Sequence, residues 1–256
     1  MTEQVTEEIS IERPGEWVAL VEFNRPPNNF FDARLIGAIA DAYDQLEKEG
    51  VRAIVLASTG KHFCAGANFG AASSGADEPR SLYREALRLF AARTPVVAAV
   101  QGAAVGGGLG LALAADFRVA CPASRFSANF ARLGFHHGFA LSVTLPALAG
   151  EQTALDLLLT GRRVPGEEAL SLGLCDRLVC DAEVRPAAHA LAAEVAQNAP
   201  LAVRSIRATL RAGLLERVEA ALEREASEQD RLRQTDDFRE GVAASLERRT
   251  PRFSGS

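Results

Sequence analysis

The stretch that decides the fold of this chain is Val96–Cys121, which reads VVAAVQGAAVGGGLGLALAADFRVAC. It begins with the β-branched run Val96–Val100, and a short apolar run of this kind is typical of a strand covered on both faces. The segment Leu109–Ala115 contains only small or apolar residues, so it predicts a short helix that is buried all round. A second buried strand is expected after this helix.

Three glycines, Gly106, Gly107 and Gly108, separate the first strand from the helix. Three consecutive glycines fit poorly inside a helix, but they let the backbone come close to a ligand because they carry no side chain. The turn directs free backbone N–H groups, at the positive end of the helix dipole, into the protein interior. We therefore expect this place to stabilise negative charge on an oxygen atom.

Composition limits the possible classes of protein. The 256 residues, 48% hydrophobic and 24% charged, suffice for one large domain, or one domain with an appendage, and an ample core. A net charge of −5 argues against a nucleic-acid partner. The chain shows no apolar run long enough for a membrane span and no signal-like start, so we expect a cytoplasmic protein without a membrane partner. The four cysteines lack metal-ligand spacing and are expected to be free thiols, so no metal site is predicted.

The N-terminal part predicts alternating strands and helices. Two strands, Ile9–Ile11 and Trp17–Phe23, flank a Pro-Gly turn and should form a hairpin. Asp32 is a plausible N-cap for a helix that continues through Glu47, and the next strand follows at Arg52–Ala57. Strand, helix and strand with short links are typical of a right-handed parallel α/β crossover.

The pattern becomes wholly helical after residue 181, and the turn signal Asn198–Pro200 divides the chain. We expect an α/β core domain over residues 1–198 and a helical C-terminal region over residues 199–256. An apolar stripe in this region needs something to cover it, and it consists of Leu214, Val218, Ala221 and Leu222.

Two other uses of the glycines do not fit. A dinucleotide-binding turn has the spacing Gly-x-Gly-x-x-Gly and an acid about 20 residues further on, which the segment Gly106–Gly110 lacks. A phosphate-binding P-loop would require Gly-Lys-Ser/Thr, which the chain also lacks.

Six segments, taken in order, resemble the crotonase superfamily, the enoyl-CoA hydratase/isomerase family. They are Asn24–Asn29, Phe63–Asn68, Gly102–Gly108, Ala115–Ala120, Ala199–Ala202 and Asp237–Val242, the last followed by Arg248–Pro251. The resemblance implies an α/β fold: a crotonase-like spiral of ββα units with two nearly perpendicular sheets, then a C-terminal helical trimerisation region. It also implies a homotrimer or a dimer of trimers, and an acyl-CoA thioester ligand from fatty acyl-CoA metabolism. Coenzyme A is then part of the substrate, and no separate cofactor is expected.

The resemblance assigns roles to individual residues. Two backbone N–H groups hold the thioester oxygen in this family, and by position they belong to Ala65 and Gly107. Arg248 matches a basic position that reaches a CoA phosphate from a neighbouring subunit, although an exposed arginine at a helix end is an equal alternative. Further substrate contacts are expected from Pro27, Asn28, Cys64, Ala67, Asn68, Phe69, Gly106 and Phe130, with Asn68 standing where an Asp is usual.

The chain departs from the family at the two glutamates that move protons in the hydratases. Gly110 and Phe130 stand at these positions, and neither side chain can transfer a proton. General acid–base catalysis is typically worth about 10²–10⁴-fold, so hydration of an enoyl-CoA should be slow or absent.

Two neighbouring histidines are the candidates for a replacement base. His136 and His137 qualify because imidazole titrates near neutral pH, and His137 adjoins Gly138, which matches the catalytic glutamate of one isomerase branch of the family. Two hypotheses stay open. One is an isomerase-like or other acyl-CoA enzyme, and the other is a non-catalytic acyl-CoA carrier or binding module.

Overall fold

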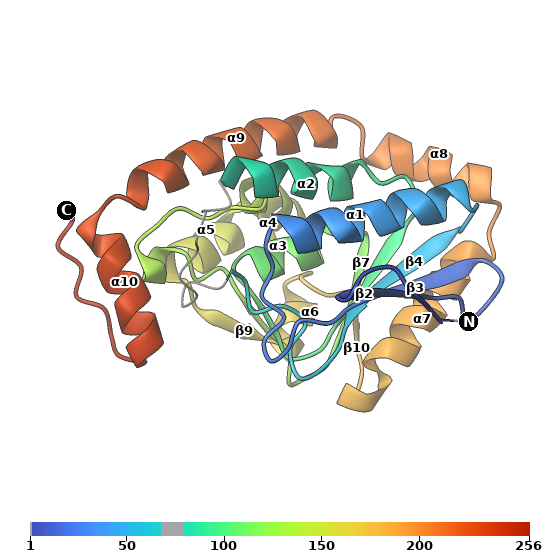
Figure 1. The fold of residues 1–256 in the computed structure, drawn as a ribbon, viewed down its shortest axis with the longest axis horizontal. Helices are drawn as coiled ribbons and strands as arrows, with labels where there is room; N and C mark the ends of the chain where they lie inside the picture. The colour runs from blue at the N-terminus through green and yellow to red at the C-terminus, as the bar shows by residue number, and fades with distance from the viewer. Residues whose placement is uncertain (1, 68–78) are drawn as a thin grey trace.

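The computed structural model describes residues 2–67 and 79–256, and within these ranges the strands form two sheets (Figure 1). The larger sheet has the order β1 (Thr2–Gln4), β2 (Ile9–Glu12), β3 (Val18–Phe23), β4 (Ala53–Ser58), β5 (Val96–Val100), β7 (Phe117–Ala120) and β10 (Arg177–Leu178). The smaller sheet has the order β6 (Ala103–Val105), β8 (Arg125–Ser127) and β9 (Arg163–Pro165). The chain alternates between the sheets, because β5 and β7 enter the larger one and β6 and β8, which follow them, enter the smaller one.

The structure describes ten α-helices, and some of them cover the two faces of the larger sheet. The ten helices are α1 (Ala33–Lys48), α2 (Pro79–Ala91), α3 (Gly107–Ala114), α4 (Leu141–Ala149), α5 (Glu151–Thr160), α6 (Gly166–Ser171), α7 (Val184–Ala196), α8 (Pro200–Leu210), α9 (Leu214–Leu232) and α10 (Asp236–Glu247), with short 3₁₀ turns η1 (Ala131–Leu133) and η2 (Asp181–Glu183). In Figure 1, α1 and α2 lie on one side of the strands and α7 lies on the other. None of the described helices is long and apolar enough to cross a membrane.

The parallel strands β3, β4, β5 and β7 form the centre of the fold, as the apolar runs predict. Side chains alternate between faces: Ile54 and Leu56 of β4 belong to the main core under α1 and α2, whereas Val55 packs in the smaller core under α7. The predicted hairpin is confirmed, because β2 pairs antiparallel with β3. Asp32 caps α1 as predicted, since its carboxylate accepts a hydrogen bond from the N–H of Leu35 at 2.8 Å.

The central stretch differs from the prediction at the glycines. Helix α3 already begins at Gly107, and Gly106 is its N-cap with a φ of 57°. A strand precedes it, β6, which was not predicted and whose Ala104 forms a bridge with Cys64. Gly108 allows this contact, because a β-carbon at that position would lie 2.2 Å from the carbonyl oxygen of Cys64.

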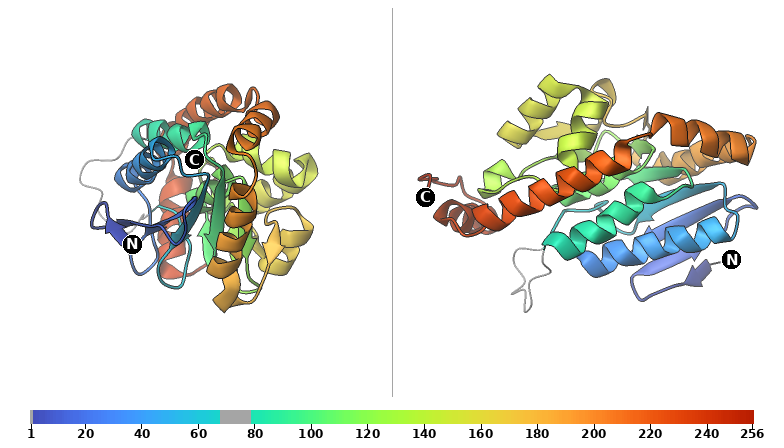
Figure 2. Two further views of the ribbon diagram at one scale, coloured as in Figure 1. Left: turned by 90° about the vertical axis from the view of Figure 1, so that its right-hand side faces the viewer. Right: turned by 90° about the horizontal axis from the view of Figure 1, so that it is seen from above.

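The C-terminal helices wrap around the α/β part, with α9 alongside α2 (Figures 1 and 2). The stripe on α9 is covered by this chain itself, because Val218 and Leu222 are 0% and 4% exposed and belong to the main core. The cover that this stripe requires therefore comes from within the chain, and the stripe does not by itself indicate an outside partner. The two most exposed large apolar side chains of this region lie on α8, where Leu201 and Leu210 are 80% and 82% exposed.

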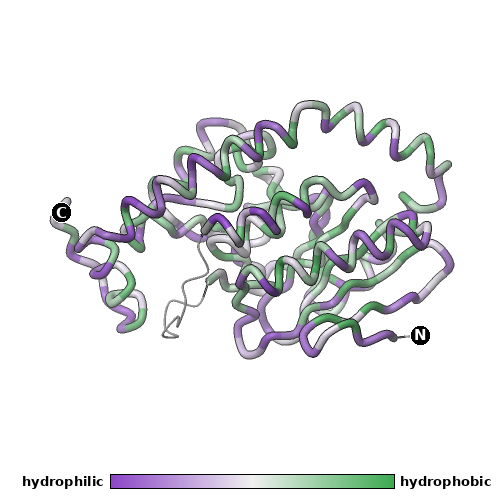
Figure 3. The backbone as a smooth tube through the Cα atoms, turned by 45° about the horizontal axis from the view of Figure 1, so that its top comes forward, coloured by the Kyte–Doolittle hydropathy of each residue, from purple (hydrophilic) through white to green (hydrophobic). Residues whose placement is uncertain are grey.

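Hydropathy follows the same arrangement. In Figure 3 the hydrophobic segments gather along the strands of the larger sheet, whereas α9 alternates between hydrophilic and hydrophobic residues along its length. The alternation fits a helix that has one face in the core and one face in solvent.

Candidate functional site

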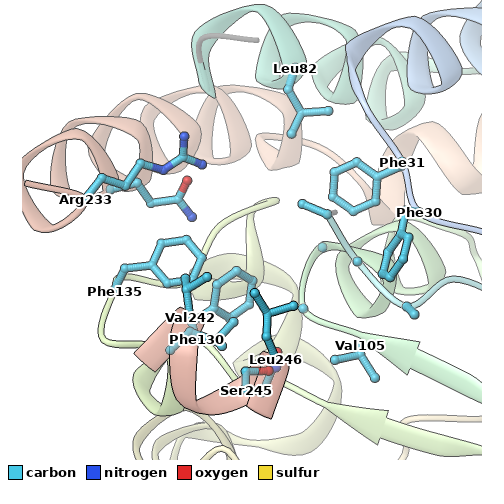
Figure 4. A pocket seen from close by; sticks show the side chains of 18 of the residues that line it. Phe30, Phe31, Leu82, Val105, Phe130, Phe135, Arg233, Val242, Ser245 and Leu246 are labelled. Atoms are coloured by element: carbon cyan, nitrogen blue, oxygen red, sulfur yellow. The ribbon is translucent and has the colours of Figure 1, made fainter. Parts of the chain in front are cut away.

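An apolar cavity lies between the loop 64–67, the start of α3, and the helices α2, α9 and α10 (Figure 4). The volume that the centre of a water-sized sphere can occupy in this cavity is about 190 Å³. A single water needs only about 10–15 Å³ by that measure, so the cavity has room for an organic group. Most of its wall is hydrophobic, with contributions from Phe30, Phe31, Leu82, Val105, Phe130, Leu133, Phe135, Val242 and Leu246.

The loop 64–67 contains an uncommitted backbone N–H group beside this cavity. The N–H of Cys64 donates to Ala103 at 2.9 Å, and the N–H of Ala65 donates to the carbonyl oxygen of Asn28 at 3.1 Å. Burial raises the pKa of the Cys64 thiol, and the N–H of Gly66 beside the sulfur acts in the opposite direction. Ala67, which lines the cavity, is the residue of this loop whose N–H has no acceptor among the described residues.

The glycine turn presents a second uncommitted N–H group. The N–H groups of Val105 and Gly106 donate to the carbonyl oxygens of Cys64 and Ser127, at 3.0 and 2.8 Å. Gly107 is the first residue of α3, where a helical N–H has no partner within its own helix. It also lines the cavity, so a donor without a partner in its own helix lies beside a largely apolar space, at the positive end of a helix dipole.

This geometry corrects one sequence-based assignment. Ala65 was predicted to supply one of the two N–H groups, but its N–H is occupied by the Asn28 carbonyl. Ala67, predicted only as a contact residue, carries the free group. The acceptor, Asn28, lies 37 positions before Ala65 in the chain. A hydrogen bond between such distant residues cannot be predicted from a local sequence pattern.

The polar side chains of the cavity are few. The hydroxyl of Tyr83 donates to Oε1 of Gln229 at 3.0 Å, and burial raises the pKa of Tyr83 well above its usual value. Asn129 and Arg233 also line the wall, and the described part of the lining contains no Asp, Glu, His or Cys. No side chain of this described lining is therefore an ordinary base at neutral pH.

Aromatic side chains fill the places where carboxylates were considered. Phe130 lines the cavity itself. A β-carbon at Gly110 would lie 2.4 Å from that of Phe139, and one at Gly138 would lie 1.8 Å from the hydroxyl oxygen of Tyr83. Neither glycine can carry a longer side chain unless these aromatic residues move.

The two histidines lie outside the lining of this cavity. Their rings stack with centroids 4.1 Å apart, and Nε2 of His137 is 3.7 Å from the carboxylate of Glu225. Burial, with a contribution from the charge of His136, lowers the pKa of His137 to about 4. Glu225 accepts hydrogen bonds from the N–H groups of Ala140 and Ser142 at the start of α4, and burial raises the pKa of Glu225. A catalytic role for either histidine stays a prediction.

A second, polar groove adjoins the apolar cavity. The cations Lys61, Arg125 and Arg163 line it together with one acid, Asp181. The two spaces share three lining residues, Phe30, Ala65 and Val105. The cationic groove and the apolar cavity therefore meet at the loop 64–67, beside the free N–H groups.

Some of the other predicted contact residues line one of these spaces, and the rest line neither. Asn28 lines the cationic groove, and Gly106 lines the apolar cavity. Cys64 is buried, which raises the pKa of its thiol to about 12 and makes it a poor nucleophile. Pro27, in the turn before α1, and Arg248, at the end of α10, line neither space. Asn68 and Phe69 lie outside the described residues.

Sequence reasoning missed Gln229 and Arg233, which reach the cavity from α9 and its C-terminal end. A signal was present, because both residues continue the stripe of Val218, Leu222 and Ala226 at helical spacing. Polar residues that continue the spacing of a buried apolar stripe indicate that the buried face of the helix borders a cavity at that point.

Comparison with known proteins agrees with the fold. Residues 14–256 match the family model for enoyl-CoA hydratase/isomerase. The chain is 39% identical to a putative enoyl-CoA hydratase of Thermus thermophilus, over 92% of this chain and 97% of that protein. It is 34% identical to a probable enoyl-CoA hydratase of Bacillus subtilis, over 94% and 96%. The crystal structure of an enoyl-CoA hydratase/isomerase from Pseudoalteromonas atlantica superimposes with a TM-score of 0.87 at 31% identity, and the match covers 97% of this chain and 100% of that one.

The family match spans nearly the whole chain, and the mixed α/β architecture with its parallel-rich sheet is that of the solved relatives. This chain belongs to the enoyl-CoA hydratase/isomerase family of the crotonase superfamily.

Proposed function

We propose that the chain binds an acyl-CoA thioester and polarises its carbonyl group with the N–H groups of Ala67 and Gly107. The observation that carries this proposal is the meeting of a cationic groove and an apolar cavity beside these two donors. An acyl-CoA is divided in the same way, with anionic phosphates at one end, a largely apolar acyl group at the other, and the thioester between them. Family membership supports the same ligand.

Two donors held by the main chain would stabilise the charge that develops on the thioester oxygen when a proton leaves the neighbouring carbon. They are fixed before the ligand arrives, because β6 and the start of α3 hold both segments. Removing one donor of this kind in another enzyme costs about 2.7–4 kcal/mol of transition-state stabilisation.

The reaction we propose is not efficient hydration. Adding water to an enoyl thioester requires groups that position the water and deliver a proton, and Phe130 and Phe139 occupy the corresponding space. An isomerase-like or other reaction at the carbon next to the thioester remains the first candidate. The second candidate is a non-catalytic acyl-CoA carrier, which is favoured by the lack of Asp, Glu, His and Cys in the described lining.

Calorimetric titration tests the binding site. Crotonoyl-CoA and crotonoyl-pantetheine share the acyl group and the thioester, but only the first carries the nucleotide phosphates. The double variant Lys61→Ala with Arg163→Ala should bind crotonoyl-CoA more weakly and crotonoyl-pantetheine unchanged, because both cations line the polar groove.

A matched control is Arg162→Ala, whose arginine pairs with Asp156 and Glu168 and lines neither space. This control should leave both affinities unchanged. A folded parent protein that shows no saturable binding of either thioester would overturn the proposed function.

A further inference from the structure

Arg233 is the single charged side chain in the described lining of the apolar cavity. It follows directly on the last residue of α9 and extends into the cavity. Figure 4 shows its guanidinium group on the wall opposite Phe30, Phe31 and Val105. The space between these walls is where the acyl group lies in the proposed function.

The guanidinium has no anionic partner in the described part of the chain. Its Nε is buried and has no hydrogen-bond partner there. The nearby acids of α9 are engaged elsewhere, because Asp230 pairs with Arg80 at 3.1 Å and Glu228 pairs with Arg231 at 2.8 Å. Burying part of a cation without a partner is unfavourable, so its presence requires an explanation.

Its neighbours do not supply the missing acceptor. The ring of Phe135 lies 6.0 Å from the guanidinium carbon, at the outer limit of a cation–π contact. The amide of Gln229 is already used, because its oxygen accepts the Tyr83 hydroxyl and its nitrogen donates to the carbonyl oxygen of His136 at 2.9 Å. Arg233 is therefore the strongest hydrogen-bond donor that this wall leaves free for a ligand.

We propose that Arg233 binds a carboxylate at the far end of the acyl group, so that the preferred ligand is the CoA monothioester of a short dicarboxylic acid. This inference rests on the proposed acyl-CoA site. A planar guanidinium matches a carboxylate with two parallel hydrogen bonds, and it is always charged. The phosphates of coenzyme A already have Lys61 and Arg163 on the other side of the loop 64–67, so Arg233 is left for the acyl end.

The experiment compares thioesters of equal length with and without a terminal carboxylate. The pairs are succinyl-CoA with butyryl-CoA, glutaryl-CoA with valeryl-CoA, and adipyl-CoA with hexanoyl-CoA, titrated by calorimetry. In at least one pair, the parent should bind the dicarboxylic thioester about tenfold or more tightly, which is the size expected for a hydrogen bond to a charged group.

Substitutions then locate the source of this preference. Arg233→Met should abolish the preference, so that the two members of each pair bind with equal affinity, and Arg233→Lys should retain part of it because the charge remains. Arg231→Met is the matched control, because that arginine is on the same helix but exposed and paired with Glu228. The ratio of two affinities separates recognition from a general loss of folding.

The outcomes that overturn this inference differ from those that overturn the proposed function. If the parent binds both members of every pair equally, or prefers the plain thioesters, the acyl-CoA site stands and the carboxylate recognition is wrong. If Arg233→Met keeps the preference, another residue provides it and this assignment is wrong. If the folded parent binds none of the six thioesters, the proposed function fails and this inference fails with it.

Discussion

Gly110 lies so close to Phe139 that no side chain fits between them. Gly110→Glu should therefore fail to create hydratase activity, also when combined with Phe130→Glu. Overpacking typically costs about 1–3 kcal/mol, and a buried carboxylate without a partner adds a desolvation cost. Chemical denaturation measures the stability, and a crotonoyl-CoA hydration assay measures the activity.

Gly15→Glu is the control for this pair of variants, because a β-carbon at Gly15 meets no atom within 4 Å. It should leave stability nearly unchanged. A stable Gly110→Glu variant that hydrates crotonoyl-CoA would contradict this prediction. It would show that the Phe139 side chain can move away at little cost in stability.

His137 allows a direct test of the sequence-based hypothesis that it is the catalytic base. Its ring lies outside the described lining, and a pKa of about 4 makes imidazole a weak base. We expect His137→Ala to leave α-proton exchange of a bound acyl-CoA in deuterated water at the parent rate, whatever that rate is. Loss of exchange with unchanged acyl-CoA affinity would instead identify His137 as the base.

The same histidine should make stability depend on pH. The fold keeps His137 neutral down to a pKa of about 4, whereas the unfolded chain takes up a proton at its ordinary pKa of 6.5. Its contribution to stability is therefore fully present above pH 6.5 and is lost as the pH falls from 6.5 toward 4.

Between pH 7.5 and pH 5 this linkage amounts to about 2 kcal/mol. His137→Gln should lose less stability over that interval than the parent, as measured by urea denaturation. Glu225, whose pKa is raised by burial, acts in the opposite direction and is present in both proteins. Parallel stability curves for parent and variant would refute the assignment.

At the scale of elements, the close approach of α3 to the loop 64–67 helps to position the two N–H donors, in addition to the hydrogen bonds between Cys64 and β6. Gly108→Ala should push these segments apart, because its β-carbon would meet the carbonyl oxygen of Cys64 at 2.2 Å. We expect a loss of about 1–3 kcal/mol in stability and weaker acyl-CoA binding. Thermal denaturation and calorimetry measure the two effects, and Gly15→Ala should change neither. Unchanged affinity in Gly108→Ala would mean that the spacing of the donors is not set here.

The sequence predicted the long elements well, because burial leaves a clear pattern along them: a continuous apolar run in β5 and a helical period in α1. Strand β5 and the capped helix α1 begin and end within about one residue of the prediction. The strands β6, β8 and β9 have three residues each, too few for a period to appear. These short strands hold the glycine turn, so the start of α3 was also placed two residues too late.

The candidate site was predicted in outline and missed in detail. Gly107 and the loop 64–67 follow from their sequence motifs, and both line the cavity. Which N–H of the loop is free depends on the carbonyl of Asn28, and the polar wall depends on α9, more than 100 residues further along the chain. Contacts between such distant residues have no local signature.

At the scale of the whole molecule, α8 carries the most exposed large apolar side chains of the described residues. Leu201, Ile206 and Leu210 are 80%, 61% and 82% exposed. We expect a homotrimer or a dimer of trimers at micromolar concentration, measured by light scattering, because apolar side chains grouped on one helix favour association.

Leu201→Asp combined with Leu210→Asp should lower the measured mass if α8 forms the interface. Leu159→Asp, on α5 and 72% exposed in the parent, tests a second surface in the same way. A parent protein that is monomeric at these concentrations would contradict the expected assembly.

The two donors proposed for this site, Ala67 and Gly107, are main-chain groups. Any residue except proline supplies the same N–H group, so point mutations of side chains can erase the acid–base chemistry of such a site and leave its carbonyl recognition intact. A lineage can therefore exchange one reaction for another, or lose catalysis altogether, while its affinity for thioesters persists. For this architecture, inheritance of carbonyl recognition by the main chain and inheritance of the reaction are separate questions.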